Sequence, residues 1–352
     1  MEAIGEQAAL LQREWQTSHR WAGITRDFSA LDVIRLRGRV AGEHGPARRG
    51  AGRLWELLHH RGGAPTLGAF AGHHAAQAAG VDAIYLPGWQ GDDETRMPGL
   101  VRGVNRALAE AAPAGSETAR GVGPERRLPA IVADAGGSSD AVLDAFGLTT
   151  EMIGAGAAAV CFEDLTSTDR ADRRAGEQAL VPTRHHIGTL NAARLAADVL
   201  GVPSLIIART GAHAASLLTS AIDPRDHEFL TGERTADGLH RVEPGWYACV
   251  TRQLAYAPYA DLLWLETPAP DLDLARAFAC IIHSQYPDKP LAYSYRAPVA
   301  GPARASGASA AEFQRELAAM GFRFQATPPI GHSAPSAGLA GQPAYDDAPA
   351  YA

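Results

Sequence analysis

One stretch of the chain, Pro129 to Asp164, most constrains the fold, because it holds a complete strand, helix and strand. Two short apolar runs, PAIVAD and AAVCFED, predict strands, and each ends in acid. Between them, residues 141–155 carry apolar side chains at helical spacing, and Gly154 and Gly156 suit a helix end. The stretch therefore predicts one β/α unit of a parallel sheet.

Runs of the same kind recur along the chain, with helical stretches between most of them. They are PTLGAFAG (65–72), AIYLPGW (83–89), SLIIART (204–210), DLLWLET (261–267), PLAYSYR (290–296) and FRFQATP (322–328). Together these runs make about eight β/α units, the number that closes a parallel sheet into a TIM-type (β/α)8 barrel, an α/β fold. We expect N-terminal helices over residues 1–62, the barrel over 63–330 and a disordered tail over 331–352.

The composition argues against several classes of protein. No stretch of the 352 residues approaches the ~18 uninterrupted apolar residues of a membrane helix. A formal charge of −7 gives no basic footprint for nucleic acid. The first residues lack the basic and then apolar order of a secretion signal, and the three cysteines lie far apart. We therefore expect a cytoplasmic protein with no membrane or nucleic-acid partner.

Lysine is nearly absent, since Lys289 is the only one in the chain. A Schiff-base aldolase, a pyridoxal-phosphate enzyme and a Walker-type phosphate loop each need a placed lysine. Lys289 precedes its predicted strand and so falls on the barrel face away from the expected site. Carbon chemistry here would depend on a metal ion or on the polarity of a keto acid.

Polar side chains follow the predicted strands, on the barrel face where active sites of this fold lie. Asp134 and Glu163 end consecutive strands, and two neighbouring carboxylates repel unless a cation or a shared proton lies between them. This favours Mg²⁺, and the alternative is a pair of solvated rim acids. Arg209 ends another strand, where its fork suits the carboxylate of a ligand or, alternatively, an internal salt bridge.

Three polar segments between the predicted strands remain open to interpretation. In the loop from Pro87 to Pro98, Gly88 permits close approach to a ligand and Trp89 offers an apolar wall, unless the loop is an ordinary connection. Thr166 to Gln178 is typical of a mobile loop or lid. Residues 219–245 predict a long irregular insertion.

Several blocks of the sequence resemble the isocitrate lyase family. They are RWAGITRDFSALDVIRLRG, AIYLPGW, LVPT, LAADVLGVPSLIIART, LLTSAIDPRDHEFLTGERTADG, LAYAPYADLLWLET and FQRELAAMGFRFQ. The resemblance runs from about Trp21 to Gln325. It implies a TIM-type barrel that binds Mg²⁺ and glyoxylate and cleaves a 2-hydroxy acid to glyoxylate and succinate.

The resemblance also implies roles for individual residues. In the metal site, Asp134 matches the magnesium aspartate, Glu163 matches a glutamate near the metal, and Asp93 aligns with a further aspartate if its loop is shortened. Arg209 matches the arginine that binds the substrate carboxylate.

In the glyoxylate site, Gly88 and Trp89 match residues that hold this ligand, although Pro87 replaces a serine. The pocket for the second carboxylate stands here as residues 294–298, in which Arg296 would make the site narrower and more cationic.

Other positions depart from the family. Its catalytic loop, Lys-Lys-Cys-Gly-His, falls in Thr166 to Gln178, where this chain has no lysine, cysteine or histidine. Gly136, Cys161 and Gly211 stand where the family has glutamate, histidine and aspartate. We expect a homo-oligomeric, Mg²⁺-dependent lyase, and these departures lead us to expect as its substrate a small 2-oxo or 2-hydroxy carboxylate other than isocitrate. The alternatives are a catalytically silent binding or scaffold protein and a true isocitrate lyase.

Overall fold

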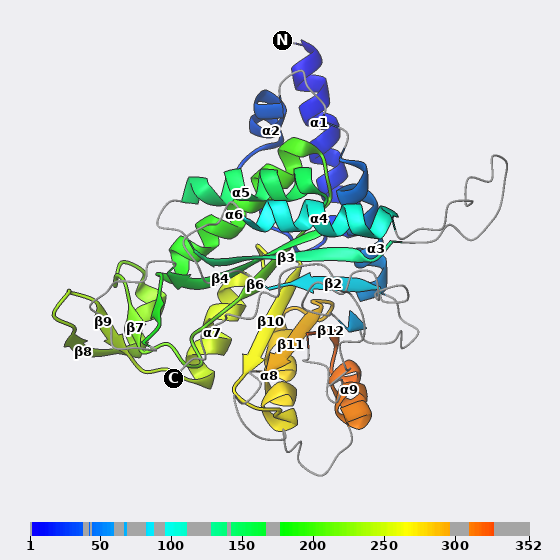
Figure 1. Ribbon diagram of the computed structural model, residues 1–352. Helices are drawn as coiled ribbons and strands as arrows, with labels where there is room; N and C mark the ends of the chain where they lie inside the picture. Colours follow the sequence, from blue (N-terminus) through cyan, green and yellow to red (C-terminus); the bar gives the residue numbers. More distant parts are fainter. Residues whose placement is uncertain are drawn as a thin grey trace.

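A computed structural model describes residues 2–37, 42, 44–59, 67–68, 82–87, 96–110, 128–138, 142–166, 177–295 and 310–326 (Figure 1). Parallel strands form the centre of the molecule. They are β1 (Leu67–Gly68), β2 (Ala83–Leu86), β3 (Ala130–Ser138), β4 (Ala159–Thr166), β6 (Leu205–Arg209), β10 (Leu262–Thr267), β11 (Leu291–Tyr295) and β12 (Phe322–Ala326).

These eight described strands pair in the order of the sequence, from β2 through β3, β4, β6, β10 and β11 to β12 and then β1. The ends of this series, β1 and β2, also contact each other. The curled parallel sheet confirms the expected TIM-type barrel, and each run that predicted a strand contributes one.

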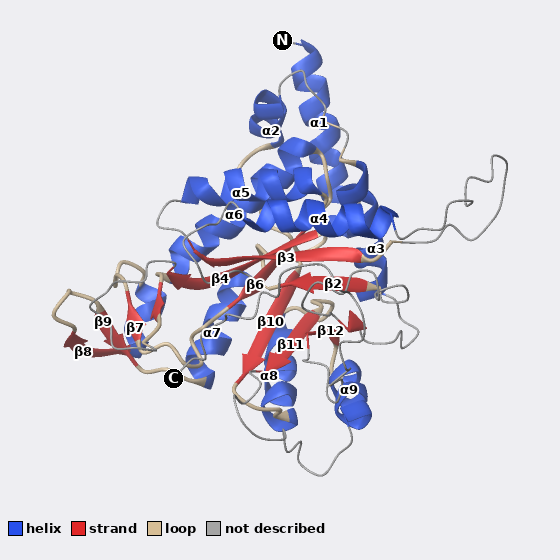
Figure 2. Cartoon of the chain, viewed as in Figure 1, coloured by secondary structure: helices blue, strands red, loops and turns tan. Residues whose placement is uncertain are grey.

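Helices cover the outside of this sheet (Figure 2). They are α4 (Arg96–Glu110), α5 (Val142–Ala155), α6 (Thr183–Leu200), α7 (Trp246–Tyr256), α8 (Leu272–Gln285) and α9 (Ala310–Ala319). Figure 1 shows α4, α5 and α6 beside β3 and β4, and α8 and α9 beside β10 to β12. The strands are therefore buried on both faces, as the apolar runs in the sequence require.

Alternate residues of each strand face the two sides of the sheet. One buried set, which includes Ile131, Val160 and Ile206, packs in the same cluster as residues of the covering helices. The other set, which includes Val132, Cys161 and Ile207, packs in the barrel interior. This alternation decides which side chain at a strand end points into the barrel mouth.

The N-terminal helices pack beside the barrel as α1 (Glu2–Thr17), the 3-10 helix η1 (His19–Trp21), α2 (Ala30–Arg37) and α3 (Gly45–His59). At the start of α2, the Ser29 amide donates to the Asp32 carboxylate, and the Asp32 amide donates to Ser29 Oγ. This reciprocal pair is a capping box.

The region expected to be irregular, 219–245, is instead ordered, and that expectation was wrong. It holds a 3-10 helix, η3 (Pro224–Phe229), and an antiparallel pair, β8 (Leu230–Arg234) and β9 (His240–Val242). The pair extends a small sheet with β5 (Ala179–Leu180) and β7 (Leu217–Leu218), which joins the barrel through β4. These strands are short, and most of their partners are distant in sequence, so local periodicity did not show them.

Within the described ranges, no helix combines the length and apolar character needed to cross a bilayer. The tail expected over 331–352 lies outside the described residues, as do most of the polar segment 166–178 and the loop 88–95.

Candidate active site at the carboxyl ends of the strands

Five polar side chains meet where the parallel strands end, and we call this group the acid–arginine site. Its members are Tyr85 of β2, Asp134 of β3, Glu163 of β4, Arg209 of β6 and Glu266 of β10. The strand register sets Glu163 directly opposite Arg209. Each of the five lies two positions after a residue of the interior core, so their side chains point into the barrel mouth.

Arg209 is the centre of this group. Its Nη2 lies 2.8 Å from a Glu163 oxygen and 3.2 Å from an Asp134 oxygen, and its Nη1 lies 3.8 Å from Glu266. Nη1 also donates to the Tyr85 hydroxyl at 3.3 Å. The buried Nε has no hydrogen-bond partner among the described residues, which leaves one donor available to a ligand.

Asp134 is held by groups from both sides. Its Oδ2 accepts a hydrogen bond from the Tyr85 hydroxyl, and its Oδ1 accepts one from the Gly136 amide at 2.8 Å. Gly136 has a φ of +76°, a conformation that glycine adopts without a steric penalty. The glycine at this position therefore supports the orientation of the carboxylate.

Trp264, in the barrel interior, packs against the acid–arginine site. Its ring lies 4.9 Å from the Tyr85 ring and 5.7 Å from the Arg209 guanidinium carbon. Its indole N–H donates to Ser294 Oγ at 2.9 Å. The arginine therefore rests over an aromatic face, which favours a cation.

The pKa values in the site reflect burial and crowded charge. Burial, together with the negative charges of Glu266 and Asp134, raises the pKa of Glu163 to about 7 despite the opposing effect of Arg209. Burial alone would lower the pKa of Arg209, but Asp134 and Glu163 hold it well above its usual range. Burial, followed by the charge of Asp134, raises the pKa of the Tyr85 hydroxyl well above its usual range.

The implied Mg²⁺ can be tested against these donors. Asp134 and Glu163 offer carboxylate oxygens, which this ion prefers, and the same oxygens now contact Arg209. Among the described residues no group of three or more acidic, histidine or cysteine side chains is arranged around a metal position. The donor chemistry fits an ion that has few protein ligands and keeps several waters.

The structure brings together the predicted residues that it describes, Asp134, Glu163 and Arg209. The internal salt bridges of Arg209, one of its two expected roles, are present, and its role toward the carboxylate of a ligand stays a prediction. The other candidates, Gly88, Trp89, Asp93 and Arg296, lie outside the described residues.

Sequence reasoning missed Tyr85 and the place of Glu266 in the site. The available signal was the period of two within each strand: Tyr85 is the last interior position described in β2, and Glu266 follows Trp264 by two.

Gly211 lies two residues after Arg209, where the resemblance implies an aspartate. A side chain there would begin 2.6 Å from a terminal carbon of Leu165 and 2.7 Å from its Cγ. Leu165 packs in the small core beneath β7 and β9. An aspartate at position 211 would therefore require the Leu165 side chain to shift.

The fold and the site define a TIM-type barrel protein with carboxylates and an arginine at the carboxyl ends of its strands. A model of the isocitrate lyase family matches residues 116–234 and 231–334. Isocitrate lyase 1 of Mycobacterium tuberculosis (strain ATCC 35801 / TMC 107 / Erdman) is 42% identical over 92% of this chain and 80% of its own length. Isocitrate lyase of Escherichia coli (strain K12) is 43% identical, with the same two coverages. The chain belongs to the isocitrate lyase family.

Solved structures support the fold. A 2,3-dimethylmalate lyase, described as a PEP mutase/isocitrate lyase superfamily member, gives a TM-score of 0.53 at 19% identity, covering 80% of this chain and 82% of that one. An oxaloacetate acetylhydrolase with bound oxalate gives 0.51 at 17% identity, covering 79% and 80%.

The relatives correct the expected function. We expected a substrate other than isocitrate, but relatives identical at 41–43% over 90–92% of the chain are isocitrate lyases. The expectation of another substrate depended on the few missing catalytic-loop residues. Identity to isocitrate lyases along 92% of the chain outweighs these few positions.

Proposed function

We propose that the protein is an isocitrate lyase, which splits isocitrate into glyoxylate and succinate. The observation that carries the proposal is the contact of Asp134, Glu163 and Arg209 at the barrel mouth, in a chain that matches isocitrate lyases over 92% of its length. A bound Mg²⁺ would polarise the oxygens of the glyoxylate half of the substrate.

Arg209 binds and orients the carboxylate of that half. Its guanidinium is already fixed by Glu163 and rests over Trp264, and Nε remains available to an acceptor. The Nε–H can donate to one oxygen of that carboxylate, and the guanidinium charge attracts the anion. Asp134 and Glu163 would hold the cation beside it, and the Tyr85 hydroxyl fixes Asp134.

Proton magnetic resonance of isocitrate incubated with purified protein and Mg²⁺ tests this function. We expect isocitrate to disappear while succinate and glyoxylate appear in equal amounts, at a rate proportional to protein and suppressed by a chelator.

A second outcome would reassign the function. Thr166 to Gln178 contains no lysine, cysteine or histidine to donate a proton to the succinate carbanion. If Mg²⁺ and glyoxylate together raise the melting temperature but isocitrate stays intact, the protein binds the ligand without turnover.

A further inference from the structure

The carboxylate next to Glu163 faces away from the barrel mouth and is completely buried. Asp164 is 0% exposed, because alternation turns it toward α7. Its two oxygens accept four hydrogen bonds of 2.7 to 2.9 Å, from Thr210 Oγ1, the Gly211 amide, Arg252 Nη1 and the Tyr256 hydroxyl. Thr210 and Gly211 directly follow Arg209, so Asp164 ties the end of β4 to the end of β6.

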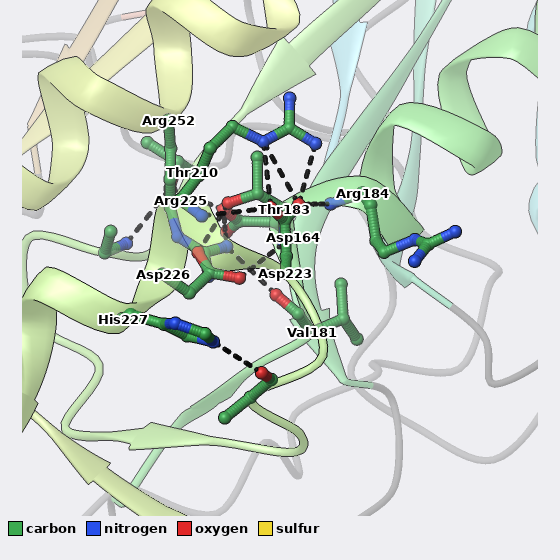
Figure 3. Close-up of polar contacts among 12 residues, drawn as sticks. Asp164, Val181, Thr183, Arg184, Thr210, Asp223, Arg225, Asp226, His227 and Arg252 are labelled. Carbon is green, nitrogen blue, oxygen red and sulfur yellow. Dashed lines mark hydrogen bonds and ion pairs between the residues drawn. The ribbon is translucent and has the colours of Figure 1, made fainter.

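Arg252 of α7 extends this connection. Its Nη1 donates to Asp164 at 2.9 Å and to the Val181 carbonyl at 3.0 Å, while its Nη2 donates to Asp226 at 2.8 Å. Asp226 in turn accepts from the amide and the hydroxyl of Thr183, at 2.9 and 2.6 Å. Figure 3 draws Arg252, Asp164 and Asp226 with their polar contacts as dashed lines. We call Asp164, Thr183, Thr210, Asp226, Arg252 and Tyr256 the Asp164 network.

The chemistry of this network needs arginine. Arg252 is 2% exposed and lies between two carboxylates that are themselves buried. Its planar fork reaches both of them and a carbonyl at once, whereas a lysine ammonium is a single point of charge. Satisfied buried networks of this kind fix one geometry. The site residues Glu163 and Arg209 are each joined by one peptide bond to a residue of the network.

We propose that Arg252 is a positioning residue for the acid–arginine site. Through Asp164 it holds the ends of β4 and β6, so that Glu163 and Arg209 stay in contact with each other and both point toward the ligand. This role rests on the proposed isocitrate lyase activity. The side-chain hydrogen bonds of Arg252 go to Asp164, Val181, Asp226 and Tyr256, so its effect on the acid–arginine site passes through the backbone.

The chain offers a matched control at the opposite end of the barrel. Arg194 is 1% exposed, pairs with the buried Asp261 and donates to the Ser204 carbonyl at 3.1 Å. Asp261 and Ser204 directly precede β10 and β6, so these contacts lie at the amino ends of the strands. Arg252→Lys and Arg194→Lys therefore make the same change at nearly equal burial, but at opposite ends of the barrel.

The experiment combines steady-state kinetics, thermal melting and residue-resolved amide hydrogen exchange on the full chain. Both variants should melt at lower temperature. Arg252→Lys should lower kcat/KM for isocitrate about 10- to 100-fold and speed exchange at Gly211 and Thr183. Arg194→Lys should keep kcat/KM within about twofold and speed exchange at Ile206, whose amide donates to Asp261 at 2.7 Å.

Equal kcat/KM values for the two variants would overturn the positioning role, as would unchanged exchange at Gly211 in Arg252→Lys. If Arg252→Lys does not fold, Tyr256→Phe takes its place, because it removes one hydrogen bond to Asp164 and keeps every charge. Its kcat/KM and its exchange at Gly211 are then compared with those of Arg194→Lys. A wild-type protein that releases no glyoxylate refutes the proposed activity instead, and exchange at Gly211 then decides the positioning role by itself.

Discussion

Carboxylates outnumber cations around Arg209. One guanidinium faces the carboxylates of Asp134, Glu163 and Glu266, so the site is negative when all three are ionised. A substrate that brings further carboxylates is repelled by this arrangement unless a cation enters. The residues therefore support the assignment of a divalent ion to Asp134 and Glu163.

Asp134→Asn tests this assignment. The amide keeps the shape of the carboxylate but removes its charge, so we expect the affinity for Mg²⁺ to fall at least ~10-fold in titration calorimetry. Asp273→Asn is the control, because Asp273 is 96% exposed on α8. Equal heats for the wild type and Asp134→Asn would show that the ion binds elsewhere.

Gly211→Ala tests the contact with Leu165. The new methyl group would lie 2.6 Å from a Leu165 carbon, so we expect the free energy of unfolding to fall by about 1–3 kcal/mol. Gly147→Ala, inside α5 with no atom within 4 Å of the new methyl, should instead stabilise by up to about 1 kcal/mol. Urea denaturation measures both values, and a neutral Gly211→Ala would contradict the close approach.

At the scale of elements, the amino ends of the strands carry a second group of buried charges. Lys289, before β11, donates to the Ala260 carbonyl at 2.7 Å, beside Asp261 and its partners Arg20 and Arg194. Arg20 reaches this group from η1 and also contacts the Trp21 and Trp55 rings. The N-terminal helices are therefore fastened to the barrel by charge and aromatic contacts on the face away from the site.

Lys289 gives stability a predictable pH dependence. Burial lowers its pKa from 10.5 to about 8, so between these values the unfolded chain binds more protons than the folded one. Stability from this group therefore rises with pH from about 8 to about 10.5, by at most about 3 kcal/mol.

Urea unfolding of the wild type and Lys289→Met at pH 7.5, 8.5 and 9.5 measures this effect. The free energy of unfolding of the wild type should rise relative to that of the variant at each step. Lys289 is the only lysine in the sequence, so no other lysine titrates in this range. A difference that stays constant over this range would contradict the lowered pKa.

At the scale of the whole molecule, the sequence predicted the barrel because each of its strands is a short apolar run that precedes a polar end. The small sheet of β5, β7, β8 and β9 was missed, since two- to five-residue strands carry little periodicity. In the site, Asp134, Glu163 and Arg209 could be found from their places at strand ends. Tyr85 and Glu266 join them only through side-chain alternation across strands distant in sequence, and the Asp164 network depends on α7, which no local pattern connects to β4.

Steady-state cleavage of isocitrate by the Arg209→Lys variant tests most directly whether the acid–arginine site performs the reaction. Lysine keeps the charge but loses the fork, so kcat/KM should fall about 10- to 100-fold below the wild type, equivalent to about 1–3 kcal/mol. Wild-type activity in Arg209→Lys would contradict the account, because isocitrate would then be cleaved without the arginine on which this site is centred.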